Sequence, residues 1–191
     1  MSYGTLTVVC GPMFAGKSTE VLKRVLWAKN GLRRPVAVFK PSFDNRYAET
    51  EIVSHDGLRT PAQSIAALPE RVTFSELVIK PRAALIVLDE CQFFEPPYVE
   101  GDTVEWVRTR LAAGFDFIAA GLDMDWQGKP FRVTADLIAM ADEVVKVSAN
   151  CTVCGRNAPK TYKLTPEGGS VELGAQDKYE ARCNEHWFNR T

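Results

Sequence analysis

The sequence predicts an α/β fold: a mostly parallel sheet with helices on both faces, followed by a small second unit. Short apolar runs alternate with segments of helical periodicity along most of the chain. The first apolar run leads through a glycine-rich loop into a helix. Two close pairs of cysteine and histidine residues stand near the C-terminal end, where a metal ion can stabilise a unit with little core.

The first strand and helix flank a phosphate-binding motif. Residues 6–10 are apolar and predict a buried strand, and the segment after the loop has an apolar face of Val21, Leu22, Val25 and Leu26. The loop and the start of its helix are Gly11, Pro12, Met13, Phe14, Ala15, Gly16, Lys17 and Ser18, which match G-x-x-x-x-G-K-[ST]. Backbone N–H groups and the helix N-terminus favour an anion there. The motif predicts triphosphate binding, with Lys17 near the β- and γ-phosphates and Ser18 on Mg²⁺; the alternative is an ordinary turn with an exposed lysine.

The next hundred residues continue the alternation. Residues 35–39 predict a short buried strand, and the polar residues 41–60 predict an irregular surface loop near the phosphate site. Weak periodicity suggests one short helix over residues 65–68 and the start of another over residues 72–78.

The second strong signal is the apolar run 83–88, which ends in Asp89 and Glu90. A run without a polar face fits a central parallel strand, and ligands bind at the carboxyl ends of such strands. We expect Asp89 to hold Mg²⁺ through water, opposite Ser18, and Glu90 to accept a proton from the group that attacks the γ-phosphate. The alternative is a pair of solvated acids that close the strand.

The remaining elements complete the sheet. Residues 102–113 predict a helix, with Asp102 and Glu105 as a capping box and an apolar face of Val104, Val107 and Leu111. Residues 115–120 and 143–147 predict strands, and residues 134–141 predict a helix between them.

A metal site is predicted near the C-terminal end, with the ligands Cys151, Cys154, Cys183 and His186. Two C-x-x-[CH] pairs suit tetrahedral Zn²⁺, and four protein ligands leave no open position, so the zinc is expected to be structural. A redox Cys-x-x-Cys pair is the alternative. Cys10 is interpreted as a core residue. Cys91 is interpreted as a small core filler, with a reactive thiol as the alternative.

Composition limits the function further. The chain has 191 residues, 46% of them hydrophobic, and a formal net charge of −1, so neither nucleic acid nor a membrane is an expected partner. Neither a secretion signal nor an apolar run of membrane-spanning length is recognised, and the odd number of cysteines favours a reducing cytoplasm. We predict a nucleotide-binding domain over residues 1–148 and a zinc-binding lid domain over residues 149–191, with the loop between the zinc ligands covering a substrate.

Taken together, these motifs resemble the zinc-containing thymidine kinases, the tetrameric family of bacteria, large DNA viruses and animal cytosol. Residues 11–19 are similar to the family's phosphate loop, and residues 89–94 resemble its Asp-Glu-Ala-Gln-Phe-Phe signature. Residues 121–131, residues 177–179 and the four zinc positions also match. Trp126 stands where the family usually has Phe, and Cys91 where it has Ala.

The resemblance implies a role for each matching position. Glu90 would take the proton from the 5′-hydroxyl of thymidine, Asp89 and Ser18 would serve Mg²⁺, and Lys17 the transferred phosphoryl group. Gln92, Asp44 and Arg46 would lie near the phosphates. The nucleoside pocket would comprise Met13, Phe93, Leu122, Trp126, Phe131, Tyr179 and the segment Ser170, Val171, Glu172, Leu173 and Gly174. It further implies a homotetramer that binds ATP and phosphorylates thymidine and also deoxyuridine.

We therefore predict an ATP:thymidine 5′-phosphotransferase of nucleotide salvage. Two other functions share part of the pattern. A nucleic-acid-stimulated ATPase with a zinc ribbon would also carry the phosphate loop and adjacent acids, but it would need a basic surface that the composition does not supply. A non-catalytic nucleotide sensor would need no base at position 90.

Overall fold

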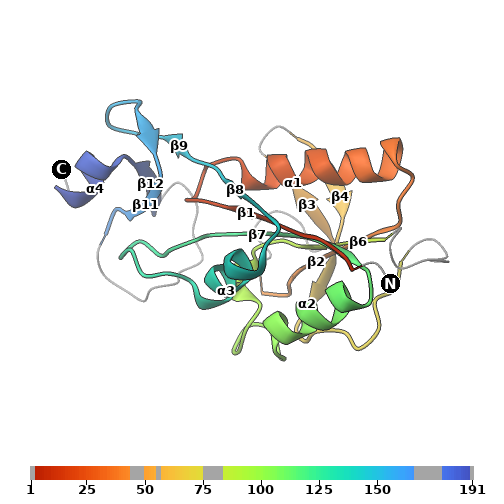
Figure 1. Ribbon diagram of the computed structural model, residues 1–191. Coiled ribbons are helices and arrows are strands. Elements are labelled where there is room, and N and C mark those ends of the chain that lie inside the picture. The colour runs from red at the N-terminus through yellow and green to blue at the C-terminus, as the bar shows by residue number, and fades with distance from the viewer. Residues whose placement is uncertain (1–2, 44–49, 55–56, 75–83, 166–177, 190–191) are drawn as a thin grey trace.

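The chain is built around a six-stranded parallel sheet (Figure 1). A computed structural model describes residues 3–43, 50–54, 57–74, 84–165 and 178–189. Every strand pair in this sheet is parallel. Its strands, in spatial order, are β5 (Gln63–Ile65), β2 (Val36–Pro41), β6 (Leu85–Leu88), β7 (Asp116–Gly121), β1 (Leu6–Cys10) and β8 (Glu143–Lys146). The predicted parallel sheet is confirmed.

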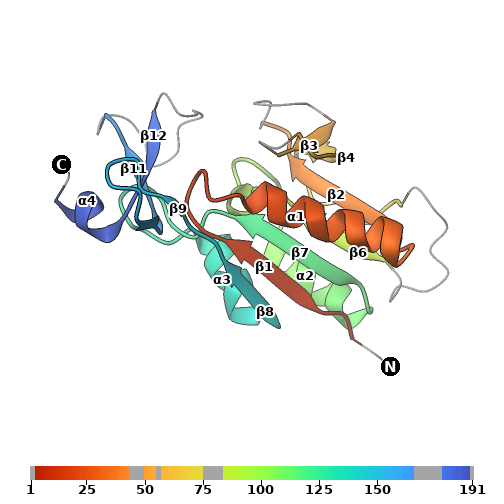
Figure 2. The same ribbon diagram turned by 90° about the horizontal axis from the view of Figure 1, so that it is seen from above.

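Helices cover both faces of the sheet, as predicted (Figures 1 and 2). On one face α1 (Lys17–Leu26) packs Val21, Leu22 and Val25 against side chains that include Val9 and Val87. On the other face α2 (Thr103–Ala112) and α3 (Arg132–Met140) pack over the alternate strand residues, such as Val8 and Leu88. Because successive strand residues point to opposite faces, each strand contributes to both apolar layers.

The carboxyl ends of the central strands meet at one edge, and this edge gathers the predicted site. Cys10 is in register with Gly121, and Leu88 is in register with Phe39. The segments that follow β1, β2, β6 and β7 therefore start side by side. Two of them are the phosphate loop and the Asp89–Glu90 pair, which are 71 or more positions apart in the sequence.

Two local predictions are wrong. Residues 65–68 do not form a helix: Ile65 ends the short strand β5, which pairs with the end of β2. The region 41–60 is not wholly irregular, because β3 (Glu51–Val53) and β4 (Arg59–Pro61) form an antiparallel ribbon. Three-residue strands are too short to leave a clear alternation, so their pairing partners decide the structure. Of the helix suggested over residues 72–78, residues 72–74 are not helical and the rest lies outside the described residues.

The capped helix α2 is confirmed, and its predicted apolar face is confirmed at Val107, which is buried, and at Leu111, which packs against the core. The Asp102 side chain accepts a hydrogen bond from Glu105 N at 3.0 Å, which satisfies one free N–H of the first turn. The buried residues are Thr103, Trp106 and Val107, whereas Val104 is only partly buried. The Trp106 ring packs edge-on against Phe39 and Phe117, so the large aromatic residue rotates the helix towards the sheet.

A small C-terminal unit stands beside the carboxyl edge of the sheet (Figure 2). It contains the short ribbon of β9 (Ala149–Asn150) and β10 (Asn157–Ala158), the ribbon of β11 (Lys160–Lys163) and β12 (Tyr179–Arg182), and helix α4 (Asn184–Phe188). Its fully buried cluster consists of only Cys151, Ala158, Ala181 and Cys183 among the described residues. No helix in the described part of the chain is long and apolar enough to cross a bilayer.

Candidate active site and metal centre

The phosphate loop has the strained backbone that an anion cradle needs. Gly11, Phe14 and Gly16 all have positive φ angles, of 149°, 64° and 75°. A Cβ atom at Gly11 would lie 2.2 Å from the Val147 carbonyl oxygen, so only glycine fits there. A positive φ at Phe14 is unusual for a non-glycine residue and is typical of functional loops.

Lys17 links the loop to the acidic pair that follows β6. Its ammonium group donates a hydrogen bond to the Pro12 carbonyl oxygen at 2.7 Å. Burial lowers the pKa of Lys17, while the negative charges of Glu90 and Asp89 act on it in the opposite direction. The two carboxylates therefore lie within electrostatic reach of the phosphate-binding lysine, as a phosphoryl-transfer site requires.

Glu90 stands at a special backbone position. The strand β6 ends at Leu88, and Glu90 has the left-handed angles φ 55° and ψ 45° before the short 3₁₀ turn Cys91–Phe93. This conformation costs on the order of 1–3 kcal/mol for a non-glycine residue, so the surrounding contacts must maintain it.

The Gln92 side chain is a hydrogen-bond partner of Glu90. Its side-chain amide donates to Glu90 Oε2 at 2.6 Å, and its carbonyl oxygen accepts from Leu122 N at 2.9 Å. The side chain is almost completely buried. It therefore connects the predicted base to the segment that follows β7. The resemblance suggested a position near the phosphates for Gln92, which stays a prediction.

Cys91 is buried between the sheet and α3, and its sulfur contacts Thr134 Oγ1 at 3.5 Å. Burial raises the pKa of the Cys91 thiol to about 12, so the thiol is protonated at neutral pH. These properties favour the core-filler interpretation over a reactive thiol. Cys10 is also buried in the core, in agreement with its interpretation.

The aromatic part of the predicted nucleoside pocket includes more rings than the sequence suggested. Phe93 packs against Phe131 with ring centroids 6.2 Å apart. It also contacts Phe43 and Tyr98, at 4.9 and 5.2 Å between centroids, and neither was singled out in the sequence. The position of Phe43 just after β2, at the carboxyl edge, is the signal that would have identified it.

The loop 122–131 carries three other predicted pocket residues, Leu122, Trp126 and Phe131. Asp125 Oδ1 accepts hydrogen bonds from the backbone N–H groups of Gln127 and Lys129, both at 2.9 Å, and holds the turn. Trp126 is 9% exposed, and the ammonium of the buried Lys163 lies 5.5 Å from its ring centroid. Sequence reasoning did not single out Asp125 and Lys163, which contact this loop.

Four side chains that could bind a metal converge in the C-terminal unit. One ligand atom from each of Cys151, Cys154, Cys183 and His186 lies within 4.8 Å of the others. The Cys154 and Cys183 sulfurs are 3.8 Å apart, and His186 Nδ1 is 3.2 Å from Cys183 Sγ. With Zn–S bonds of about 2.3 Å, a tetrahedron separates its sulfurs by about 3.8 Å, so the geometry fits Zn²⁺.

The electrostatics of this cluster also suit a metal. Burial alone would raise the pKa of Cys151, but hydrogen bonds from backbone amides of the same cluster outweigh it and lower the value to about 6. Arg156 Nε donates to Cys154 Sγ at 3.3 Å, a contact from outside the ligand set that helps to orient this sulfur.

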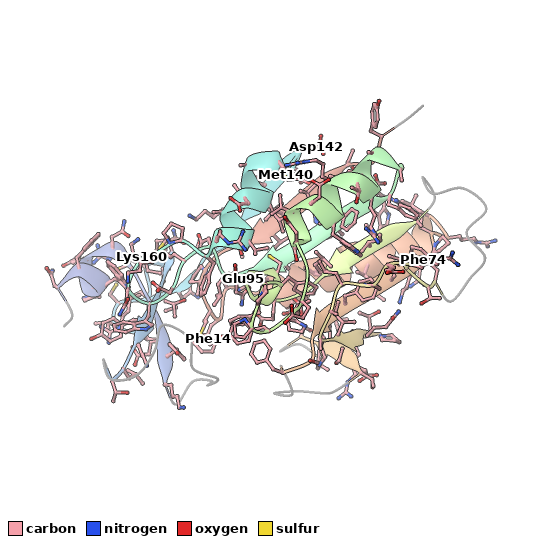
Figure 3. All side chains as sticks on the ribbon, turned by 90° about the horizontal axis from the view of Figure 1, so that it is seen from below. Phe14, Phe74, Glu95, Met140, Asp142 and Lys160 are labelled. Carbon is pink, nitrogen blue, oxygen red and sulfur yellow. The ribbon has the colours of Figure 1, made fainter. Side chains whose placement is uncertain are left out.

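The C-terminal unit contacts the phosphate loop and the loop 122–131. Figure 3 labels Phe14 of the phosphate loop and Lys160 at the start of β11. Met13 N donates to Thr161 Oγ1 at 3.0 Å. Tyr179, another predicted pocket residue, is buried on β12. Asp44, Arg46 and the segment Ser170, Val171, Glu172, Leu173 and Gly174 lie outside the described residues, so their roles stay predictions.

Two comparisons with known proteins identify the family of this chain. A family model described as "Thymidine kinase" matches residues 4–187. A curated protein named thymidine kinase, from Thermococcus kodakarensis (strain ATCC BAA-918 / JCM 12380 / KOD1), is 40% identical over 193 residues, which cover 96% of this chain and 93% of that protein. The chain belongs to the thymidine kinase family of enzymes.

Proposed function

We propose that the enzyme transfers the γ-phosphoryl group of ATP to the 5′-hydroxyl of thymidine, and also of deoxyuridine, in pyrimidine deoxynucleoside salvage. The observation that supports this most directly is that the phosphate loop and the acidic pair lie close together. The negative charges of Glu90 and Asp89 act to raise the pKa of Lys17. A cation that can neutralise a phosphoryl group and a carboxylate that can take a proton are the two requirements of the reaction.

In the proposed mechanism the loop residues 11–18 hold the triphosphate with their backbone N–H groups, and Lys17 balances its charge. Lys17 must leave the Pro12 carbonyl, to which it donates in the described chain, when it contacts a phosphate. Ser18 and Asp89 have the oxygen donors that would hold Mg²⁺, which when bound neutralises charge on the phosphates.

Glu90 acts as the general base. Its Oε2 atom accepts a hydrogen bond from Gln92, which leaves the carboxylate oriented while its other oxygen receives the proton of the 5′-hydroxyl. The nucleobase stacks among Met13, Phe93, Leu122, Trp126, Phe131 and Tyr179, because a base offers flat apolar faces that aromatic rings match. Residues 170–174 supply hydrogen bonds to its edge.

The domain division proposed is residues 1–148 for nucleotide binding and residues 149–191 for the zinc-binding lid, and the proposed location is the cytoplasm. We also propose a homotetramer. In support, Trp27 and Val144 are 67% and 45% exposed, and Val144 lies on β8, an edge strand of the sheet. Sedimentation velocity should give about four times 21.2 kDa; a species of one chain mass at micromolar concentration would contradict the tetramer.

The substitution Glu90→Gln tests the function. It keeps the shape of the side chain but removes the base, so turnover of thymidine should fall by roughly 100-fold or more while MgATP still binds. Glu100→Gln, at an exposed acid ten positions later, is the matched control and should turn over normally. The measurement is a labelled-ATP assay over a panel of nucleosides, alongside calorimetric ATP binding.

Three outcomes would contradict the proposal. Parental turnover by Glu90→Gln would show that Glu90 is not the base. ATP consumption that requires DNA and ignores thymidine would favour an ATPase, and ATP binding without any phosphorylated nucleoside would favour a nucleotide sensor.

A further inference from the structure

A hydrogen bond joins the metal-binding unit to the phosphate loop. Thr161, on β11, is 4% exposed, and its hydroxyl oxygen accepts from the backbone N–H of Met13 at 3.0 Å. The two residues are 148 positions apart. Met13 lies between two strained positions, Gly11 and Phe14, both with positive φ angles. An external bond at this point therefore helps to determine the shape of the loop.

Thr161 is itself held by the segment that supplies two of the four metal ligands. Its carbonyl oxygen accepts from Trp187 Nε1 at 3.0 Å. Trp187 directly follows His186, and its own N–H donates to the Cys183 carbonyl at 2.9 Å. Thr161 is also in register with Ala181 on β12, the strand that leads to Cys183.

A metal ion in the Cys/His cluster would help to fix the position of Thr161, because the apolar core of the unit is small. The buried apolar cluster of its described part has four members, and two of these are the ligands Cys151 and Cys183. Without the ion the unit retains few buried contacts to offset the entropy of ordering its chain. The route from the ion to the loop is therefore His186 and Cys183, then Trp187, then Thr161, and finally the Met13 amide.

We propose that Thr161 is a positioning residue through which the metal centre stabilises the binding conformation of the phosphate loop, so that affinity for MgATP depends on zinc. The reason is preorganisation: a loop held in its bound shape loses less entropy when the triphosphate arrives. The inference rests on the proposed function only in taking MgATP as the ligand, and it gives the zinc unit a role at the nucleotide as well as over the nucleoside.

The first experiment compares single variants of the full chain by calorimetry with MgATP, in the absence of nucleoside. Thr161→Val removes the acceptor and should raise the Kd by roughly 3- to 10-fold, the usual net effect of one hydrogen bond. Thr161→Ser keeps the hydroxyl and should bind almost as the parent does. Thr152→Val is the matched control, because that hydroxyl, in the same unit, bonds Glu180 and not the loop; its Kd should not change.

Trp187→Phe removes the indole donor to Thr161 and keeps an aromatic ring. It should also raise the Kd for MgATP, by a smaller factor than Thr161→Val does. Zinc content by elemental analysis and near-ultraviolet circular dichroism confirm that each variant is folded and loaded. In steady-state assays the KM for ATP should rise in Thr161→Val with kcat nearly unchanged.

The second experiment removes zinc with a chelator. The Kd of the parent should rise by at least the factor seen for Thr161→Val, whereas Thr161→Val should lose little further affinity. An unchanged Kd in Thr161→Val, or an equal loss in both proteins on chelation, would overturn the inference. A parent chain that does not bind MgATP at all would instead refute the proposed function, so the two failures are distinguishable.

Discussion

At the scale of single residues, Gln92 is the position on which the geometry of the proposed base depends. Its amide spans from Glu90 Oε2 to the N–H of Leu122, and so it joins the ends of β6 and β7. Gly121 makes room for it: a Cβ atom there would lie 2.5 Å from Gln92 Oε1 and 2.7 Å from Cys91 Sγ. The sequence motif contains Gln92, but its two partners come from contacts across the strands.

We predict that Gln92→Leu lowers kcat by roughly 10- to 100-fold, because a base displaced by about 1 Å loses that much rate. Gly121→Ala should give a similar loss by pushing Gln92 aside. The KM for ATP should change little, since the phosphate loop is untouched. Steady-state kinetics with both substrates tests this, and a normal kcat in both variants would show that Glu90 needs no such support.

Cys91 and Trp106 illustrate what residue types alone leave open. A cysteine beside two acids is compatible with a reactive thiol until burial raises its pKa to about 12. Trp106 lies on the buried face of α2, where its ring packs against Phe39 and Phe117, which come from strands distant in the sequence. Side-chain environment, not local spacing, decides these two positions.

At the scale of elements, helix α2 shows a local signal that the structure confirms. Asp102 caps the first turn, and the Glu105 N–H is the donor that it satisfies. Such a cap depends only on residues within one turn, which is why the sequence predicts it well. The strand β5 is the opposite case, since three residues acquire their conformation by pairing with β2.

We predict that Asp102→Ala lowers the free energy of unfolding by about 1 kcal/mol, the typical cost of losing an N-cap. Chemical denaturation followed by circular dichroism measures it. Asp136→Ala, at a half-exposed acid on α3 whose ion pair with Arg132 spans 3.7 Å, is the control and should stay within about 0.5 kcal/mol of the parent. Equal destabilisation of the two variants would contradict the capping role.

At the scale of the whole molecule, two units with separate cores meet at the carboxyl edge of the sheet. The larger unit has apolar layers on both faces of six strands, while the buried apolar cluster in the described part of the smaller unit has four members. The larger unit can therefore stay folded when the smaller one loses its metal.

We predict that Cys151→Ser loses its zinc and increases proteolysis after Arg156, Lys160 and Lys163, while the far-ultraviolet signal of the large unit is retained. Zinc binding contributes on the order of 10 kcal/mol to the folding of comparable modules. The four-member apolar cluster of this unit contributes less than that. Cys10→Ala, in the core of the large unit, should keep its zinc. Elemental analysis that finds equal zinc in the Cys151→Ser variant would refute the ligand assignment.

The sequence by itself determined the parallel α/β fold, the phosphate-binding motif between β1 and α1, the acidic pair after β6 and the four Cys and His residues that could hold zinc. Each of these is encoded by residues close in the chain, where helical and strand periods, caps and ligand spacings act directly. Only the tertiary structure decided that Gln92 holds Glu90, that Thr161 holds Met13 and that Phe43 and Tyr98 join Phe93. The contacts of Thr161 with Met13, and of Phe43 and Tyr98 with Phe93, join residues that are far apart in the sequence or belong to different elements. Gln92 and Glu90 are close in the sequence, but the turn after β6 brings their side chains together. Which side chains meet is fixed by the packing of the whole chain, since no local pattern specifies a distant partner.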